Sequence, residues 1–294
     1  MNPGQASKNM IIDFSTHLIS ETLIEKLNEK RHRHGLAKIE YRFDPRNSDL
    51  DKRVELMNKF GVDTQLLSLP SLYLVGLTPE EATELCKIAT NDIYDFCNQR
   101  PDRFIGMAYI SLLRAERALD ELDRCVRDLG FKAVAIATNE NGVGIDSLQF
   151  EPFYRKVAQY DIPIFLHPTD WKSYPLVDHE MMTIFGWPFD TTQAVWRLKS
   201  SGMLDKYQNL KVIAHHMGAM LPYFYGRVDS IPRASWGRKI QLDYWKQIYG
   251  DTATLGGFDE TYMLAYSFFG ADRMVFGTDY PFGRDSGELS IEHH

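Results

Sequence analysis

The sequence predicts a TIM-like (β/α)₈ barrel that forms one domain over residues 1–294. Its length of 294 residues suits a single α/β barrel, which typically needs about 250 residues. Apolar runs alternate with amphipathic helical stretches, and His or Asp follows several of these runs. Such groups at the carboxyl ends of parallel strands are typical of a site at the top of a barrel.

Eight apolar runs, several of them rich in β-branched residues, predict the strands. They lie at residues 10–14, 64–69, 104–111, 133–137, 163–166, 210–214, 247–252 and 274–277. Nearly continuous apolar runs, rather than alternating ones, fit parallel strands that are buried on both faces. The placement of polar groups after the first, fifth, sixth and eighth runs favours a closed barrel over an open sheet.

Helices are predicted between these strands. Residues 51–60 end at Gly61, a suitable C-terminal cap, and Thr78-Pro-Glu-Glu81 is a capping box that begins a helix reaching about residue 98. Further helical stretches lie at residues 114–128, 151–159 and 191–202. This alternation predicts right-handed crossovers between parallel strands.

Two segments depart from a regular barrel. Residues 18–48 form an insertion after the first strand, which we expect to make a small cap over the barrel mouth and to include a strand near residues 39–43. The eighth helix is short or missing, because twelve residues follow Phe282. We favour loss of a C-terminal part over cover by another subunit. An uncovered apolar flank also gives a physical reason to expect a homodimer.

Composition and charge exclude some functions. The net charge of −7 disfavours nucleic acid as a partner, because phosphate binding needs a basic surface. No apolar run approaches the length of a membrane span, and residues 1–9 lack the apolar core of a signal peptide. We therefore expect a cytoplasmic protein that does not interact with membranes. The three cysteines have no metal-binding spacing and are expected to be reduced.

Four short segments carry the groups that can bind a metal or move a proton: Asp13-Phe-Ser-Thr-His17, Phe165-Leu-His-Pro-Thr169, Ala214-His-His-Met-Gly218 and Gly277-Thr-Asp-Tyr-Pro-Phe282. Each has an alternative interpretation. His17 and His167 can be structural histidines, and Asp279 can cap a helix. Alternation along a strand predicts that His215 and His216 point to different sides, so that one of them is structural.

Together these segments resemble the decarboxylase-like branch of the amidohydrolase superfamily, which includes γ-resorcylate decarboxylase and aminocarboxymuconate-semialdehyde decarboxylase. The resemblance implies one divalent metal, Zn²⁺ or Mn²⁺, held by a pair of strand-one ligands with His167 and Asp279. It also implies that the histidine after strand six acts as an acid or base. His216 fits that position because it lies two residues before Gly218 and six before Pro222.

Ser15 stands where the first ligand of the strand-one pair is expected. A neutral hydroxyl is a poor ligand for Zn²⁺. The site can therefore bind metal more weakly through His17, His167 and Asp279, with Asp13 or water completing the shell. Alternatively, it holds a harder ion such as Mn²⁺ or Mg²⁺, or it has lost its metal.

The expected substrate is a small planar carboxylic acid. Arg46 and Arg227 are candidates to bind its carboxylate, and Trp171 and Tyr174 are candidates to pack against its plane. The aromatic pair can equally form a dimer contact, and Arg227 can make an ordinary helix-surface salt bridge.

The leading hypothesis is a metal-dependent, nonoxidative decarboxylase of an aromatic or unsaturated small carboxylic acid. His216 or Asp279 then delivers a proton to the carbon that loses CO₂. The second hypothesis is a hydrolase or hydratase on the same barrel, in which His216 accepts a proton from water. The third is a catalytically silent barrel that binds a ligand.

Overall fold

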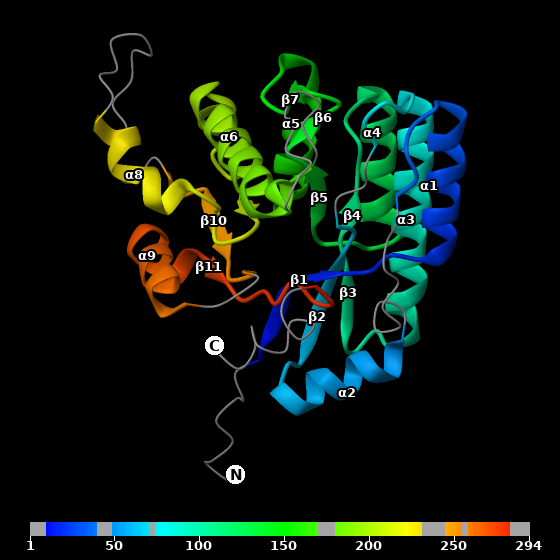
Figure 1. Cartoon of the computed structure of the whole chain (residues 1–294), viewed down its shortest axis with the longest axis horizontal. Coiled ribbons are helices and arrows are strands. Elements are labelled where there is room, and N and C mark those ends of the chain that lie inside the picture. Colours follow the sequence, from blue (N-terminus) through cyan, green and yellow to red (C-terminus); the bar gives the residue numbers. More distant parts are fainter. Residues whose placement is uncertain are drawn as a thin grey trace.

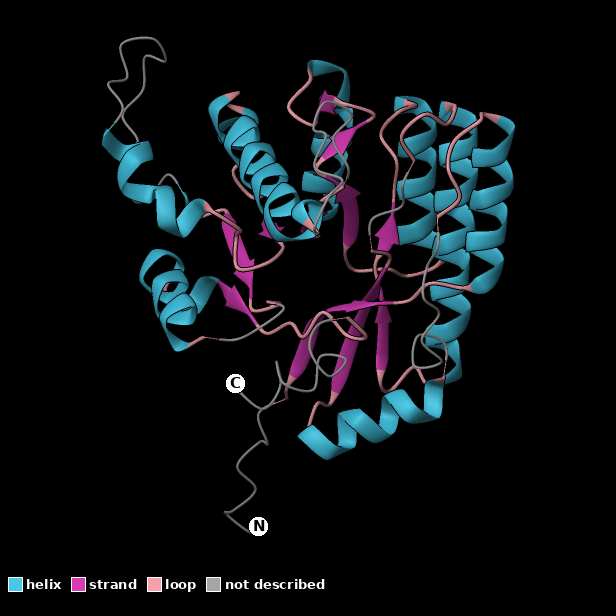
Figure 2. Cartoon of the chain, in the orientation of Figure 1, coloured by secondary structure: helices cyan, strands magenta, loops and turns pink. Residues whose placement is uncertain are grey.

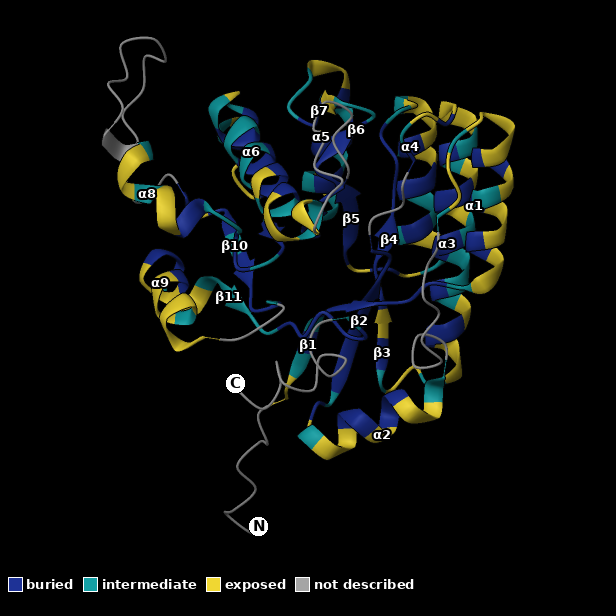
Figure 3. Cartoon of the chain, in the orientation of Figure 1, coloured by how far each residue is buried: buried dark blue, intermediate teal, exposed yellow. Residues whose placement is uncertain are grey.

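The structure, a computed structural model, describes residues 10–39, 49–70, 74–169, 180–230, 245–254 and 258–282. Its parallel strands lie at the centre and its helices lie around them (Figures 1 and 2). The buried residues, which form the core, follow the strands and the inner faces of the helices (Figure 3). None of the described helices is long and apolar enough to cross a membrane.

All the strands of the central sheets pair in parallel. One sheet has the order β1-β2-β3 and the other the order β11-β10-β9-β8-β5-β4, while β6 and β7 form a small antiparallel hairpin. The strands are β1 (Ile12–His17), β2 (Thr64–Ser68), β3 (Phe104–Gly106), β4 (Ala108–Tyr109), β5 (Val134–Ala137), β6 (Asn139–Glu140), β7 (Val143–Gly144), β8 (Ile164–His167), β9 (Val212–Ala214), β10 (Ile248–Asp251) and β11 (Met274–Val275).

The two sheets are joined on both sides, by the continuous chain on one side and by backbone hydrogen bonds on the other. The predicted third strand is divided at Met107, so that β3 pairs with β2 while β4 pairs with β5. On the other side, the Phe14 N–H donates to the Phe276 carbonyl at 2.7 Å, and the Asp279 N–H donates to the Ser15 carbonyl at 2.8 Å. The segment after β11 therefore lies against β1, which brings the first and last strand ends of the barrel together.

The helices follow the predicted alternation closely. They are α1 (Glu21–Arg33), α2 (Leu50–Phe60), α3 (Pro79–Gln99), α4 (Ala115–Asp123), α5 (Glu151–Tyr160), α6 (Trp187–Ser200), α7 (Met203–Lys206), α8 (Leu221–Ser230) and α9 (Asp259–Phe269). Both hydrogen bonds of the predicted capping box are present at the start of α3, and Gly61 caps α2 in the left-handed conformation. These local signals are decisive because each satisfies backbone groups that a helix end leaves unpaired.

The expected cap formed by residues 18–48 is wrong for its first half. Residues 21–33 form α1, which lies beside α3 on the outside of the sheet (Figure 1). Its apolar face is buried, and Lys30 donates to Glu84 of α3 at 2.7 Å. An amphipathic helix stabilises the fold by burying that face against a neighbouring helix, rather than by covering the barrel mouth. Most of the possible strand at residues 39–43, and the chain after Phe282, lie outside the described residues.

Candidate metal centre

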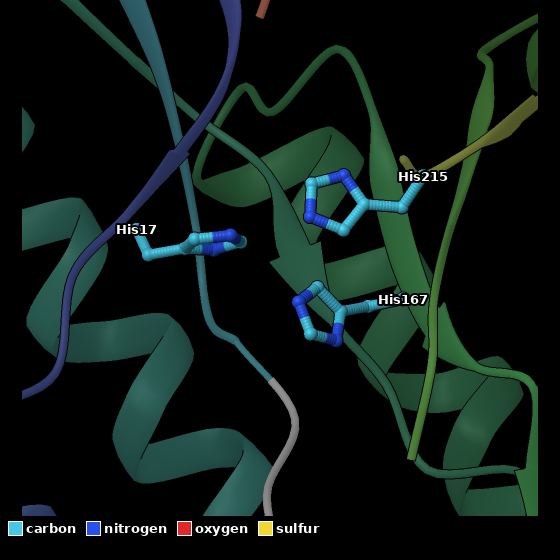
Figure 4. A group of neighbouring side chains, drawn as sticks. All are labelled: His17, His167 and His215. Atoms are coloured by element: carbon cyan, nitrogen blue, oxygen red, sulfur yellow. The ribbon is translucent and has the colours of Figure 1, made fainter. Parts of the chain in front are cut away.

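Three histidines from distant parts of the sequence meet at the carboxyl ends of the strands. His17 ends β1, His167 ends β8 and His215 follows β9. Their rings point toward one another (Figure 4), and one nitrogen from each ring lies within 4.8 Å of the others. All three are buried. The barrel therefore gathers side chains that are separated by up to 198 residues into one cluster.

The His17 ring is held by hydrogen bonds at both nitrogens. Nδ1 lies 3.0 Å from the Ser68 hydroxyl, and that hydroxyl donates to the Thr16 carbonyl at 3.2 Å. Nε2 lies 2.9 Å from Asp279 Oδ1. Burial lowers the pKa of His17, so the neutral ring is favoured. With its proton on Nε2, the ring donates to Asp279. With its proton on Nδ1, it donates to Ser68 instead, and the lone pair of Nε2 is then available to a metal.

His167 is oriented in the same way. Its Nδ1 donates to the Pro168 carbonyl at 2.8 Å, which leaves the lone pair of Nε2 available. Burial and the neighbouring His215 lower the pKa of His167 well below its ordinary value. A neutral imidazole whose other nitrogen donates to a carbonyl is the usual arrangement of a metal-binding histidine.

Asp279 adds a carboxylate to the cluster. Its Oδ1 accepts hydrogen bonds from His17 Nε2 at 2.9 Å and from His215 Nε2 at 3.2 Å. Burial alone would raise its pKa, but these hydrogen bonds lower the pKa of Asp279 well below its ordinary value. The carboxylate is therefore ionised. It faces the same space as the imidazoles.

The prediction that His215 and His216 point to different sides is wrong. Strand β9 ends at Ala214, and His216 has a φ of 58°, so the alternation of a strand does not apply to the pair. Their ring centroids are 3.8 Å apart, and both residues belong with Asp279 to a group whose possible ligand atoms lie within 4.8 Å. Burial and the charge of His215 lower the pKa of His216 to about 3.

Asp13 does not join the cluster within the described part of the chain. Its carboxylate accepts hydrogen bonds from the Thr278 backbone at 3.1 Å, from the Thr278 hydroxyl at 2.7 Å and from the Gln65 amide. Burial raises the pKa of Asp13 to about 7. The expectation that Asp13 completes a metal shell is therefore not supported by the geometry, because its oxygens tie β1 to the segment that precedes Asp279.

The donor set of the cluster fits a divalent metal. Imidazole nitrogen and carboxylate oxygen are ligands that both Zn²⁺ and Mn²⁺ accept. His17 and His167 each have Nδ1 engaged, so each can present Nε2 to a shared ion. The residues present therefore fit the metal that the sequence predicts, even though Ser15 offers only a hydroxyl.

Of the four predicted substrate-binding residues, only Arg227 lies in the described part of the chain. Arg46, Trp171 and Tyr174 lie outside the described residues. Arg227 is exposed on α8. Its proposed contact with a substrate carboxylate stays a prediction.

Sequence reasoning missed Ser68 and Asp251, and it treated His215 as a structural residue. Asp251 ends β10, and its Oδ2 is hydrogen-bonded to His215 Nδ1. Burial opposes a charge on the His215 ring, but the carboxylates of Asp251 and Asp279 raise its pKa to about 10. The rule that identified Asp279, a carboxylate at the end of a predicted strand, applies equally to Asp251.

Comparison with known proteins identifies the family. The model of the amidohydrolase family named Amidohydro_2 matches residues 12–293. A γ-resorcylate decarboxylase from a Rhizobium species is 32% identical over 253 residues, which cover 79% of this chain and 76% of that protein. A γ-resorcylate decarboxylase from a Polaromonas species is 34% identical over 254 residues, covering 79% of this chain and 77% of that protein.

Solved structures agree with this assignment. The dihydroxybenzoic acid decarboxylase of a Polaromonas species, solved with manganese and 2-nitroresorcinol, has a TM-score of 0.79 at 26% identity and covers 98% of this chain and 91% of its own. The 5-carboxyvanillate decarboxylase of Sphingomonas paucimobilis has a TM-score of 0.85 at 20% identity, covering 97% and 92%, which supports the fold. The chain belongs to the amidohydrolase family, as its motifs predict, and these relatives are decarboxylases.

Proposed function

We propose that this protein is a metal-dependent, nonoxidative decarboxylase of a small aromatic or unsaturated carboxylic acid. A hydroxylated benzoic acid is the first candidate, because γ-resorcylate decarboxylases are 32–34% identical to the chain. The observation that carries the proposal is the buried cluster of histidines with Asp279 at the carboxyl ends of the strands. It occupies the position where barrel enzymes carry out their chemistry.

His17, His167 and Asp279 are the proposed ligands of one Zn²⁺ or Mn²⁺ ion. His17 and His167 belong to the group of histidines whose possible ligand atoms lie within 4.8 Å of one another. Asp279 Oδ1 lies 2.9 Å from His17 Nε2. The manganese-bound relative supports a divalent metal and leaves the choice between Zn²⁺ and Mn²⁺ to experiment. When bound, such an ion supplies Lewis-acid polarisation of substrate oxygens.

Decarboxylation requires a proton at the carbon that loses CO₂. The C–CO₂⁻ bond breaks, its electron pair remains on the carbon, and a new C–H bond forms there. The proton comes from water, and His216 and Asp279 are the groups proposed to relay it to the carbon. Both belong to the same group of possible ligand atoms. His216 Nδ1 is buried with no hydrogen-bond partner among the described residues, so this nitrogen is available to a substrate or a proton.

Substrate recognition is proposed for Arg46, Trp171, Tyr174 and Arg227. An arginine binds a carboxylate with two parallel hydrogen bonds, and an aromatic ring packs on a planar conjugated acid. Arg227, which lies on α8, follows the segment that carries His216.

The proposal is tested by measuring CO₂ released from 2,6-dihydroxybenzoate by protein loaded with Mn²⁺ or Zn²⁺. We expect CO₂ in stoichiometric yield with the decarboxylated phenol. We also expect His216→Asn to reduce kcat by about 100-fold or more, because general acid–base groups contribute on that scale. Asp259→Asn, an exposed change on α9, is the matched control and is expected to retain full activity.

Other outcomes separate the remaining hypotheses. Hydrolysis of a lactone or an amide by the protein, with no CO₂ released from any aromatic acid, would favour the hydrolase. Unaltered ligand binding in Asp279→Ala, with no activity in either protein, would favour the silent barrel.

A homodimer in the cytoplasm completes the proposal. Large apolar side chains are exposed on and near α8 and α9, among them Tyr223, Phe258, Met263 and Tyr266. A second copy of the chain can cover such a patch. Light scattering coupled to size-exclusion chromatography is expected to give twice the chain mass of 34.0 kDa, and a monomer would contradict the dimer.

A further inference from the structure

Two buried groups beside the proposed metal site are not used by its ligand set. They are His215, which follows β9, and Asp251, which ends β10. Both are fully buried. Burying two ionisable side chains costs desolvation energy, and pairing the two groups offsets part of that cost. Their place beside the site suggests a function there. A role for them in metal binding rests on the proposed function, because it concerns the same metal.

The two side chains form one oriented unit. His215 Nδ1 is hydrogen-bonded to Asp251 Oδ2, and Asp251 Oδ1 accepts from the backbone N–H groups of Met217 and Ala253, each at 3.3 Å. The carboxylate is thus fixed by the backbone, and it fixes the imidazole in turn. With Nδ1 engaged, the His215 ring points Nε2 into the cluster, where it lies 3.2 Å from Asp279 Oδ1. A metal bound at Nε2 displaces the proton of that nitrogen.

Ser15 gives this ring its space. The Ser15 hydroxyl lies 3.2 Å from His215 Nδ1, and the serine is fully buried. On its other side, a Cβ atom placed on Gly277 would lie only 2.7 Å from Ser15 Cβ. A longer side chain at position 15 would therefore have to displace either the His215 ring or the segment around Gly277. The small residue at 15 and the imidazole at 215 fit together.

We infer that His215 is a protein ligand of the metal through Nε2, oriented by Asp251, and that Ser15 provides room for it rather than a ligand. The donor set is then three imidazole nitrogens, from His17, His167 and His215, with the Asp279 carboxylate. This assignment explains how the cluster retains a full set of strong ligands although position 15 carries a poor one. A hydrogen-bonded carboxylate behind a ligand histidine fixes its orientation and raises its basicity.

Metal affinity tests the assignment independently of activity. The protein is stripped with a chelator and titrated with Zn²⁺ and with Mn²⁺ against a chelating dye. We expect His215→Ala to weaken binding by about 100-fold or more and Asp251→Asn by about 10- to 100-fold. His216→Asn removes the adjacent ring but no proposed ligand, and Ser15→Ala removes only the hydroxyl. Both controls are expected to bind within about 3-fold of the wild type.

The outcomes separate this inference from the proposed function. Wild-type affinity in His215→Ala, with binding lost in His167→Ala, would overturn the role of His215 and leave the metal site in place. Equal affinity in all of these variants, or no binding by the wild type, would overturn the metal site as well. A loss in Ser15→Ala as large as that in His215→Ala would make the serine a ligand and contradict the inference.

A crystal structure of the wild type soaked in Mn²⁺ keeps the test valid if the variants fail to fold. The anomalous peak is expected about 2.0–2.3 Å from His215 Nε2, which is bonding distance. A peak bound to His17 and His167 but more than about 3 Å from that nitrogen would overturn the assignment.

Discussion

Glu140 makes the stability of this protein depend on pH in a direction that can be calculated. Its carboxyl group lies in β6, is 3% exposed and accepts hydrogen bonds from the Leu112 N–H at 2.8 Å and the Ser111 hydroxyl at 2.9 Å. Burial raises its pKa from 4.5 to about 7. The folded protein therefore keeps a proton that the unfolded chain releases above pH 4.5, so the stability provided by this group falls as pH rises from 4.5 to 7.

The expected size follows from the two pKa values. The difference between a pKa of 4.5 in the unfolded chain and about 7 in the folded protein corresponds to about 3.4 kcal/mol of stability in total. About 2.5 kcal/mol of this is lost between pH 5 and pH 8. Glu140→Gln has no titrating group at this position. Urea unfolding of both proteins at pH 5 and pH 8 measures the effect, because changes at all other groups cancel in the comparison. The free energies of unfolding of the two proteins are subtracted at each pH. If this difference changes by less than about 0.5 kcal/mol between pH 5 and pH 8, the reasoning is refuted.

Two further predictions concern the packing and the support of the cluster. Gly218→Ala is expected to lower the free energy of unfolding by about 2–3 kcal/mol, because the new Cβ would lie 2.5 Å from the Phe269 ring at a φ of 71°. Adding Phe269→Leu to the same chain should recover part of that loss in urea unfolding. If the unfolding free energy of the double variant falls by the sum of the two single losses, the account is contradicted. Ser68→Ala is expected to weaken metal binding by about 10-fold in the dye titration, because it removes the partner of His17 Nδ1. Unchanged affinity would show that this hydroxyl does not orient the ring.

The order of elements could be predicted because the sequence carries local signals for it. Thr78 and Glu81 form the capping box at the start of α3, and Gly61 ends α2, because both motifs satisfy backbone groups within a few residues. The break of the third strand at Met107 has no such signal. It depends on two neighbouring strands, which pair with opposite sides of the same segment.

The members of the cluster could be predicted better than their roles. His17, His167 and Asp279 were identified because each lies at the end of a predicted strand, where barrel sites form. The orientation of His215 could not be read from alternation, because the strand ends at Ala214 and the backbone then turns. The packing of α1 on α3 was also missed, since a stretch after the first strand can cover either the mouth or the side of a barrel.

The measurement that tests the central claim most directly is the metal content of protein purified without chelators, by inductively coupled plasma mass spectrometry. The wild type should be compared with His167→Ala and with the exposed control Asp259→Asn. We expect about one Zn or Mn per chain in the wild type and the control, and almost none in His167→Ala. Equal metal in all three proteins, or no metal in the wild type after supplementation with either ion, would contradict the proposed centre.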